Sequence, residues 1–166
     1  AISESSRQEA IHHLGVRPHD VVEVPCAADA RFKPDALDPS ARAELCARYG
    51  IARPFVMYTG GDDQRKNTDG LVCAFAQLPR AVRAAHQLAI VCSLLPESRS
   101  ALRALAPKTG LSADEVVLCG AVPDEDLVRL YNASALCAFP SWHEGFGLPV
   151  LEAMQCGAPV IGSNTT

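Results

Sequence analysis

The sequence lacks the features that mark several large classes of protein. Its 166 residues include 15 Lys and Arg against 19 Asp and Glu, so no excess of basic residues suggests a nucleic-acid partner. No apolar run approaches the ~18 residues that a membrane span needs, and the first residues show no signal-peptide pattern. Because 48% of the residues are hydrophobic, we expect a folded protein with its own core, located in the cytoplasm.

Close pairs of cysteines are also missing. Seven cysteines are present, but none are spaced as C-x-x-C, which disfavours a zinc site and fits a reducing compartment. No glycine occurs between residues 21 and 34, where a dinucleotide-binding turn would follow the first expected strand. We therefore expect no metal, no cofactor and no dinucleotide-dependent oxidoreductase.

Short apolar segments alternate with helical patterns along the chain. The apolar segments are continuous, as in parallel strands that are buried on both faces. Alternation of strand and helix with short links is typical of an α/β fold. We predict a doubly wound (Rossmann-like) parallel sheet of about six strands, at residues 21–24, 55–58, 88–92, 116–119, 135–139 and 159–161.

Residues 138–157 form a strand, loop and helix pattern that suits a phosphorylated ligand. The loop holds Glu144, Gly145 and Gly147, and the helix holds Glu152. Glycines let the backbone approach a ligand closely, and the free N–H groups at a helix start suit a phosphate. Carboxylates beside a phosphate are useful if they accept hydrogen bonds from hydroxyl groups. The stretch therefore indicates a site for a sugar diphosphate, with one glutamate for each flanking sugar.

A second stretch, at residues 58–67, also follows an expected strand and precedes an expected helix. It contains Gly60 and Gly61, followed by Arg65 and Lys66. The carboxyl ends of parallel strands meet at one edge of a sheet, where ligands of open α/β sheets bind. We expect these cations to clamp a diphosphate against the helix that starts at Leu148, so that the leaving group needs no metal.

These two stretches resemble those of the group 1 glycosyltransferases, glycosyltransferase family 4. The first match runs from Glu144-Gly-Phe-Gly-Leu148 through Glu152 to Val160, and the second covers the Gly-Gly and Arg-Lys-Asn segment. The resemblance implies the nucleotide-sugar-binding domain of a two-domain GT-B enzyme, filling residues 1–166 and truncated at both ends. It also implies an acceptor-binding domain that would precede Ala1. Any peripheral association with a membrane would occur only through that domain.

The resemblance implies a role for individual residues. Glu144 would contact the donor sugar as the catalytic residue, and Glu152 the ribose of the nucleotide, with Val122 beside the base. The donor sugar and diphosphate would contact Gly61, Arg65, Lys66, Gly145, Phe146, Gly147 and Leu148. Two departures stand out: Gly61 takes the place of an arginine found in many members, and Cys26-Ala27 replaces Asn-Gly in the segment 24–29.

Two other features receive structural interpretations. Asp124-Glu125-Asp126 spells the D-x-D string of metal-dependent glycosyltransferases, but it is interpreted as a helix N-cap at Asp124 followed by acids in the first turn. His143 and Trp142 are interpreted as residues of the pocket rim and wall.

The leading hypothesis is the donor-binding domain of a retaining hexosyltransferase that uses a UDP- or GDP-sugar. One alternative is a non-catalytic nucleotide-binding module. Another is a GT-B sugar-nucleotide epimerase or phosphorylase.

Overall fold

A parallel sheet of five strands forms the centre of the protein. The computed structural model describes residues 1–165, and the sheet order is β3-β2-β1-β4-β5. The strands are β1 (Phe55–Thr59), β2 (Gln87–Val91), β3 (Val116–Leu118), β4 (Leu136–Phe139) and β5 (Val160–Gly162). All neighbouring strands run parallel. The expected doubly wound α/β fold is therefore confirmed.

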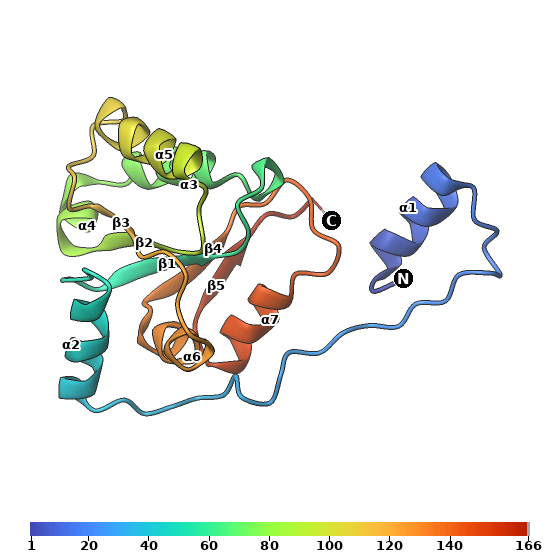
Figure 1. The fold of residues 1–166 in the computed structure, drawn as a ribbon, viewed down its shortest axis with the longest axis horizontal. Coiled ribbons are helices and arrows are strands. Elements are labelled where there is room, and N and C mark those ends of the chain that lie inside the picture. Colours follow the sequence, from blue (N-terminus) through green and yellow to red (C-terminus); the bar gives the residue numbers. More distant parts are fainter. Residues whose placement is uncertain (166) are drawn as a thin grey trace.

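Helices cover both faces of this sheet (Figure 1). One face carries α3 (Thr68–Ala76), α4 (Arg80–Ala85) and α5 (Pro96–Lys108), and the other carries α2 (Pro39–Arg48), α6 (Asp124–Ala133) and α7 (Leu148–Gln155). A short 3-10 helix, η1 (Gln64–Lys66), precedes α3. Helix α1 (Glu4–Leu14) lies apart from these layers, and a long extended segment joins it to α2 (Figure 1).

The core has two halves because successive strand residues point to opposite faces of the sheet. In β2, Leu88 and Ile90 pack into the cluster beneath α3 and α5, whereas Ala89 and Val91 pack into the cluster beneath α6 and α7. All of these side chains are buried. The continuous apolar strands of the sequence are thus strands buried on both faces.

The strand order reverses direction at β1. The chain moves outward from β1 to β2 and β3, then returns to the other side of β1 with β4 and β5. Ligands of open α/β sheets bind beyond the carboxyl ends of the strands at such a switch point. The loops that follow β1 and β4 leave the sheet there.

The expected strand at residues 21–24 is wrong, and the sheet has five strands where about six were expected. These residues have no regular secondary structure and lie outside the sheet. Val22 and Val24 are 68% and 67% exposed, so their high strand propensity has no neighbouring strand to satisfy it. Among the described residues no helix is both long and apolar enough to cross a membrane.

The two methionines provide a matched test of the core. Met57 in β1 is fully buried, whereas Met154 in α7 is 58% exposed. We expect Met57→Ala to lower the free energy of unfolding by about 2 to 5 kcal/mol, since it leaves a cavity. Met154→Ala should change it by no more than about 0.5 kcal/mol. Urea denaturation followed by circular dichroism measures both, and equal effects would contradict the assigned core.

Candidate functional site

Two loops meet at the switch point of the sheet. The β1–α3 loop covers residues 60–67, and the β4–α7 loop covers residues 140–147. The backbone N–H of Trp142 donates to the carbonyl of Arg65 at 2.8 Å, and the side-chain amide of Asn67 donates to the carbonyl of Pro140 at 3.0 Å. These cross-links hold the loops side by side although they are far apart in the sequence.

An ion pair joins the two loops at this edge. The Lys66 Nζ donates to both carboxylate oxygens of Glu144, at 2.7 and 2.8 Å. The side chains are only 16% and 27% exposed, so the pair is partly shielded from water. The buried hydroxyl of Ser141 donates to the Glu144 Oε1 at 2.6 Å. The structure therefore brings together Lys66 and Glu144, two residues that the sequence predicted to share one edge.

The pKa of Glu144 is lowered despite its burial. Burial opposes ionisation and is the largest influence on this carboxyl, but it is outweighed by the hydrogen bonds from Lys66 and Ser141 and by the charge of Lys66. Glu144 is therefore held ionised, next to a cation, at the place where ligands of this fold bind.

Glu152 has the opposite environment. It lies in α7, and its Oε2 accepts a hydrogen bond of 3.0 Å from the hydroxyl of Tyr131 in α6. Burial raises the pKa of Glu152, and the negative charge of Asp124 adds to this rise, while the bond from Tyr131 opposes it. This carboxyl is oriented by a fully buried tyrosine and is ready to accept a hydrogen bond from a ligand hydroxyl.

The start of α7 offers unpaired backbone donors. Gly147 is the N-cap, with φ 88°, a left-handed conformation that favours glycine. Within residues 1–165, the N–H groups of Gly145, Phe146, Gly147 and Leu148 donate to no backbone carbonyl. Such groups at a helix start can bind phosphate oxygens.

The other predicted residues, Arg65, Gly61 and Val122, have different surroundings. Arg65 is exposed and pairs with Asp63 at 2.9 Å. Gly61 is exposed, and open space surrounds the position that a Cβ would occupy. Val122 is half-buried in the segment between β3 and α6 and packs against the core.

The expected N-cap at Asp124 is wrong, because Pro123 occupies that position and Asp124 is the first helical residue. A proline is followed here by three acids in the first turn of α6, where the helix dipole favours them. Asp126, the other end of the D-x-D string, is buried and accepts hydrogen bonds from Arg48 and Tyr49.

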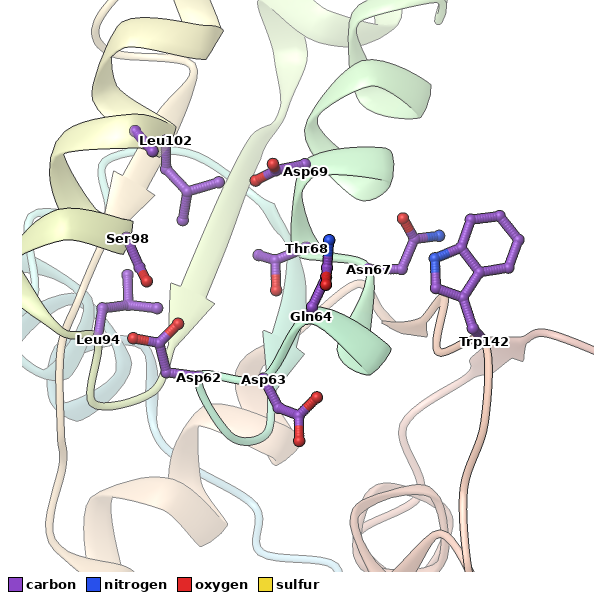
Figure 2. Close-up of a pocket in the computed structure, with 11 residues that line it drawn as sticks. Asp62, Asp63, Gln64, Asn67, Thr68, Asp69, Leu94, Ser98, Leu102 and Trp142 are labelled. Atoms are coloured by element: carbon purple, nitrogen blue, oxygen red, sulfur yellow. The ribbon is translucent and has the colours of Figure 1, made fainter.

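A separate pocket of about 380 Å³ lies between α3 and α5, beside the same edge of the sheet (Figure 2). Carboxylates of Asp62, Asp63 and Asp69 line it, together with Trp142, which is 64% exposed. Three carboxylates would repel a diphosphate. The pair of Lys66 and Glu144 and the start of α7 are therefore the better place for a phosphorylated ligand.

Sequence reasoning missed the residues that hold the site in place. Ser141 and Tyr131 orient the two glutamates, and Ser3 and Ser6 reach the β4–α7 loop from α1. Ser141 follows directly after the strand segment and could have been noticed for that reason. The others lie in different elements, so no local spacing signals them.

Comparisons with known proteins show the family of this chain. Residues 48–166 match the family profile described as "Glycosyl transferases group 1". The serotype-specific mannosyltransferase WbdA of Escherichia coli is 35% identical over 168 residues, a match that covers 100% of this chain and 20% of WbdA. The D-inositol 3-phosphate glycosyltransferase of Xylanimonas cellulosilytica is 32% identical over 172 residues, covering 98% of this chain and 40% of that protein. The chain thus spans less than half the length of these relatives.

Solved structures show the same fold. WaaG, a glycosyltransferase involved in lipopolysaccharide biosynthesis, superposes with a TM-score of 0.81 at 24% identity, covering 99% of this chain and 43% of WaaG. HepE of Anabaena in complex with UDP superposes with a TM-score of 0.80 at 25% identity, covering 99% of this chain and 44% of HepE.

Removing Lys66 tests the ion pair. We expect Lys66→Met to lower the free energy of unfolding at pH 7 by about 1 to 2 kcal/mol, between the values for exposed and buried pairs. Arg65→Met, a change at an exposed neighbour, should cost no more than about 0.5 kcal/mol.

The effect of Lys66→Met should depend on pH. The pKa of Glu144 is lowered in the folded state from its ordinary value of 4.5, so its stabilisation is present above pH 4.5 and is lost as the pH falls further. Denaturant titrations from pH 7 downward measure this, and a difference between wild type and Lys66→Met that persists in acid would contradict the ion pair as its cause.

Proposed function

Because this chain belongs to the group 1 glycosyltransferases, we propose that it is the donor-binding domain of a retaining enzyme. The full-length protein would transfer a hexose from a UDP- or GDP-linked sugar to an acceptor. The observation that carries this proposal is the Lys66–Glu144 pair beside the start of α7.

The site supplies what departure of a nucleoside diphosphate requires. Negative charge develops on the phosphate that leaves, and Lys66 together with the unpaired N–H groups of the β4–α7 loop stabilises it. Positive charge develops on the sugar ring in a glycosyl-transfer transition state. The ionised carboxylate of Glu144 stabilises that charge and accepts hydrogen bonds from sugar hydroxyls. With these groups in place, the reaction requires neither a metal nor another cofactor.

The second glutamate fits the nucleotide half of the donor. Glu152 lies in the second turn of α7 and is oriented by the hydroxyl of Tyr131. A ribose presents a pair of hydroxyls, which are hydrogen-bond donors to a carboxylate. We assign Glu152 to the ribose and the segment around Val122 to the base.

The similarity to WbdA supports mannose as the transferred sugar, whereas the similarity to HepE bound to UDP supports a uridine nucleotide. The acceptor would bind to a further domain of the full-length protein, since the relatives are more than twice as long as this chain. We place the enzyme in the cytoplasm, where its seven free thiols stay reduced.

Substitution of the two glutamates tests the division of roles. We expect Glu152→Ala to raise the Kd for UDP or GDP about tenfold, since it removes hydrogen bonds to a charged group. Glu144→Ala should leave the Kd for the bare nucleotide within about twofold and raise that for the nucleotide sugar about tenfold. Glu44→Ala, in an exposed position of α2, serves as the matched control. Isothermal titration calorimetry measures each Kd, and equal weakening of both ligands by Glu144→Ala would contradict the assignment.

Turnover by the full-length protein tests the activity itself. We expect GDP-mannose or UDP-glucose to yield free nucleotide and a glycosylated acceptor, and we expect Glu144→Ala to reduce the rate at least about a hundredfold, as does loss of a charge-stabilising group in other enzymes. Chromatography of the nucleotide product measures this. A protein that binds these donors but never releases product would be a non-catalytic nucleotide-binding module.

A further inference from the structure

Helix α1 is joined to the rest of the protein almost entirely through the β4–α7 loop. None of its residues is buried. Among the described residues, every hydrogen bond or ion pair from α1 and its N-cap Ser3 to a residue beyond 38 ends on Gly145 or His143. Figure 1 shows the helix on the outer side of this loop, away from the sheet. The contact is therefore specific to the loop that carries Glu144.

Two serine hydroxyls hold one peptide group of the loop. The Oγ atoms of Ser3 and Ser6 both donate to the carbonyl of Gly145, the bond from Ser6 measuring 3.1 Å. In a trans peptide the C=O and the following N–H point in opposite directions. Fixing the Gly145 carbonyl toward α1 therefore directs the N–H of Phe146 away from it, where that group remains unpaired within residues 1–165.

Gly145 lies in van der Waals contact with the start of α1. A Cβ built on Gly145 would lie 3.4 Å from the Cδ1 of Ile2 and 3.5 Å from the Oγ of Ser6. On the other side of Glu144, the Nε2 of His143 lies 3.3 Å from the Oε1 of Glu9. Both neighbours of Glu144 are thus held by α1, while its carboxylate is held by Lys66 and Ser141.

We propose that α1 positions the donor-binding loop. Ser3 and Ser6 are positioning residues: they set the direction of the Gly145–Phe146 peptide, and Glu9 holds the side chain of His143. This inference rests on the proposed function, because a correctly oriented loop matters only if the loop binds the donor. The N–H of Phe146 and the carboxylate of Glu144 must face the same ligand, and small errors in their direction weaken such contacts strongly.

Ser6→Ala is the cleanest test in the full-length protein. Ser3 also caps α1 by accepting from the N–H of Ser6 at 3.1 Å, so its loss would weaken the helix as well. The Oγ of Ser6, in contrast, takes no part in the cap: it donates to Gly145 and accepts a hydrogen bond of 3.2 Å from the Oγ of Ser3. Ser5→Ala is the matched control, since Ser5 lies in the same helical turn and its hydroxyl has no hydrogen-bond partner among residues 1–165.

We expect Ser6→Ala to lower kcat/KM for the nucleotide-sugar donor about fivefold, the loss that one hydrogen bond of ordinary strength produces. The KM for the acceptor and the melting temperature should not change, and Ser5→Ala should behave as wild type. Hydrogen–deuterium exchange of the amides at residues 143–148 should be faster in Ser6→Ala alone.

A second variant separates the cap from the contact. Ser3→Asp retains an oxygen that caps α1, but an ionised carboxylate cannot donate to the Gly145 carbonyl. It should therefore reproduce the kinetic loss of Ser6→Ala with the helix intact. The positioning role would be overturned if the wild type turns over and Ser6→Ala has the same kinetics as Ser5→Ala. It would also be overturned if Ser6→Ala exchanges faster but its kinetics are unchanged. Absence of turnover in wild type would instead remove the proposed function, and this inference with it.

Discussion

The lateral pairing of β1 with β4 is the constraint on which the site depends. Val56 and Met57 pair with Leu136 and Cys137, which places the ends of two strands from distant parts of the chain side by side. The loops that follow must then meet, and Lys66 lies against Glu144 although 78 residues separate them. Without this reversal of strand order, the chain would hold a lone lysine and a lone glutamate, each solvated on a different loop.

The two glutamates show how one residue type acquires two properties from its surroundings. At Glu144, hydrogen bonds from Lys66 and Ser141 overcome the cost of burial and lower the pKa. At Glu152, no cation among residues 1–165 opposes burial, and the pKa rises. The sequence contains the same side chain at both positions, and the difference comes from neighbours on other elements. On the proposed function, the ionised Glu144 would face the sugar and the tyrosine-bonded Glu152 the ribose, on either side of the charged diphosphate.

Local sequence patterns were enough to predict the fold and the edge of the sheet at which the candidate site lies. The individual side-chain contacts could be seen only in the structure. Continuous apolar segments and the strand, loop and helix order predicted a parallel sheet, and that sheet is present. The strand predicted at residues 21–24 is not formed, because strand propensity describes the preference of a residue and does not show whether a neighbouring strand is available to pair with it. Tyr131, Ser3 and Ser6 left no signal in the sequence, since their partners lie on other elements. Whether Arg65 turns toward a ligand also could not be predicted, because Asp63 two residues away competes for it.

On the proposed function, the charges at the edge of the sheet couple binding of the diphosphate to binding of the sugar. Both cations of the β1–α3 loop already have carboxylate partners, Lys66 with Glu144 and Arg65 with Asp63. On the proposed function, a diphosphate that attracts Lys66 weakens the bond that does most to lower the pKa of Glu144. Hydroxyls of the attached sugar can replace that bond, but water must do so when the nucleotide is bare. On the proposed function, Glu144 therefore takes the role of the diphosphate toward Lys66, and Lys66 takes the role of the sugar hydroxyls toward Glu144. Only a complete nucleotide sugar can replace both partners at once.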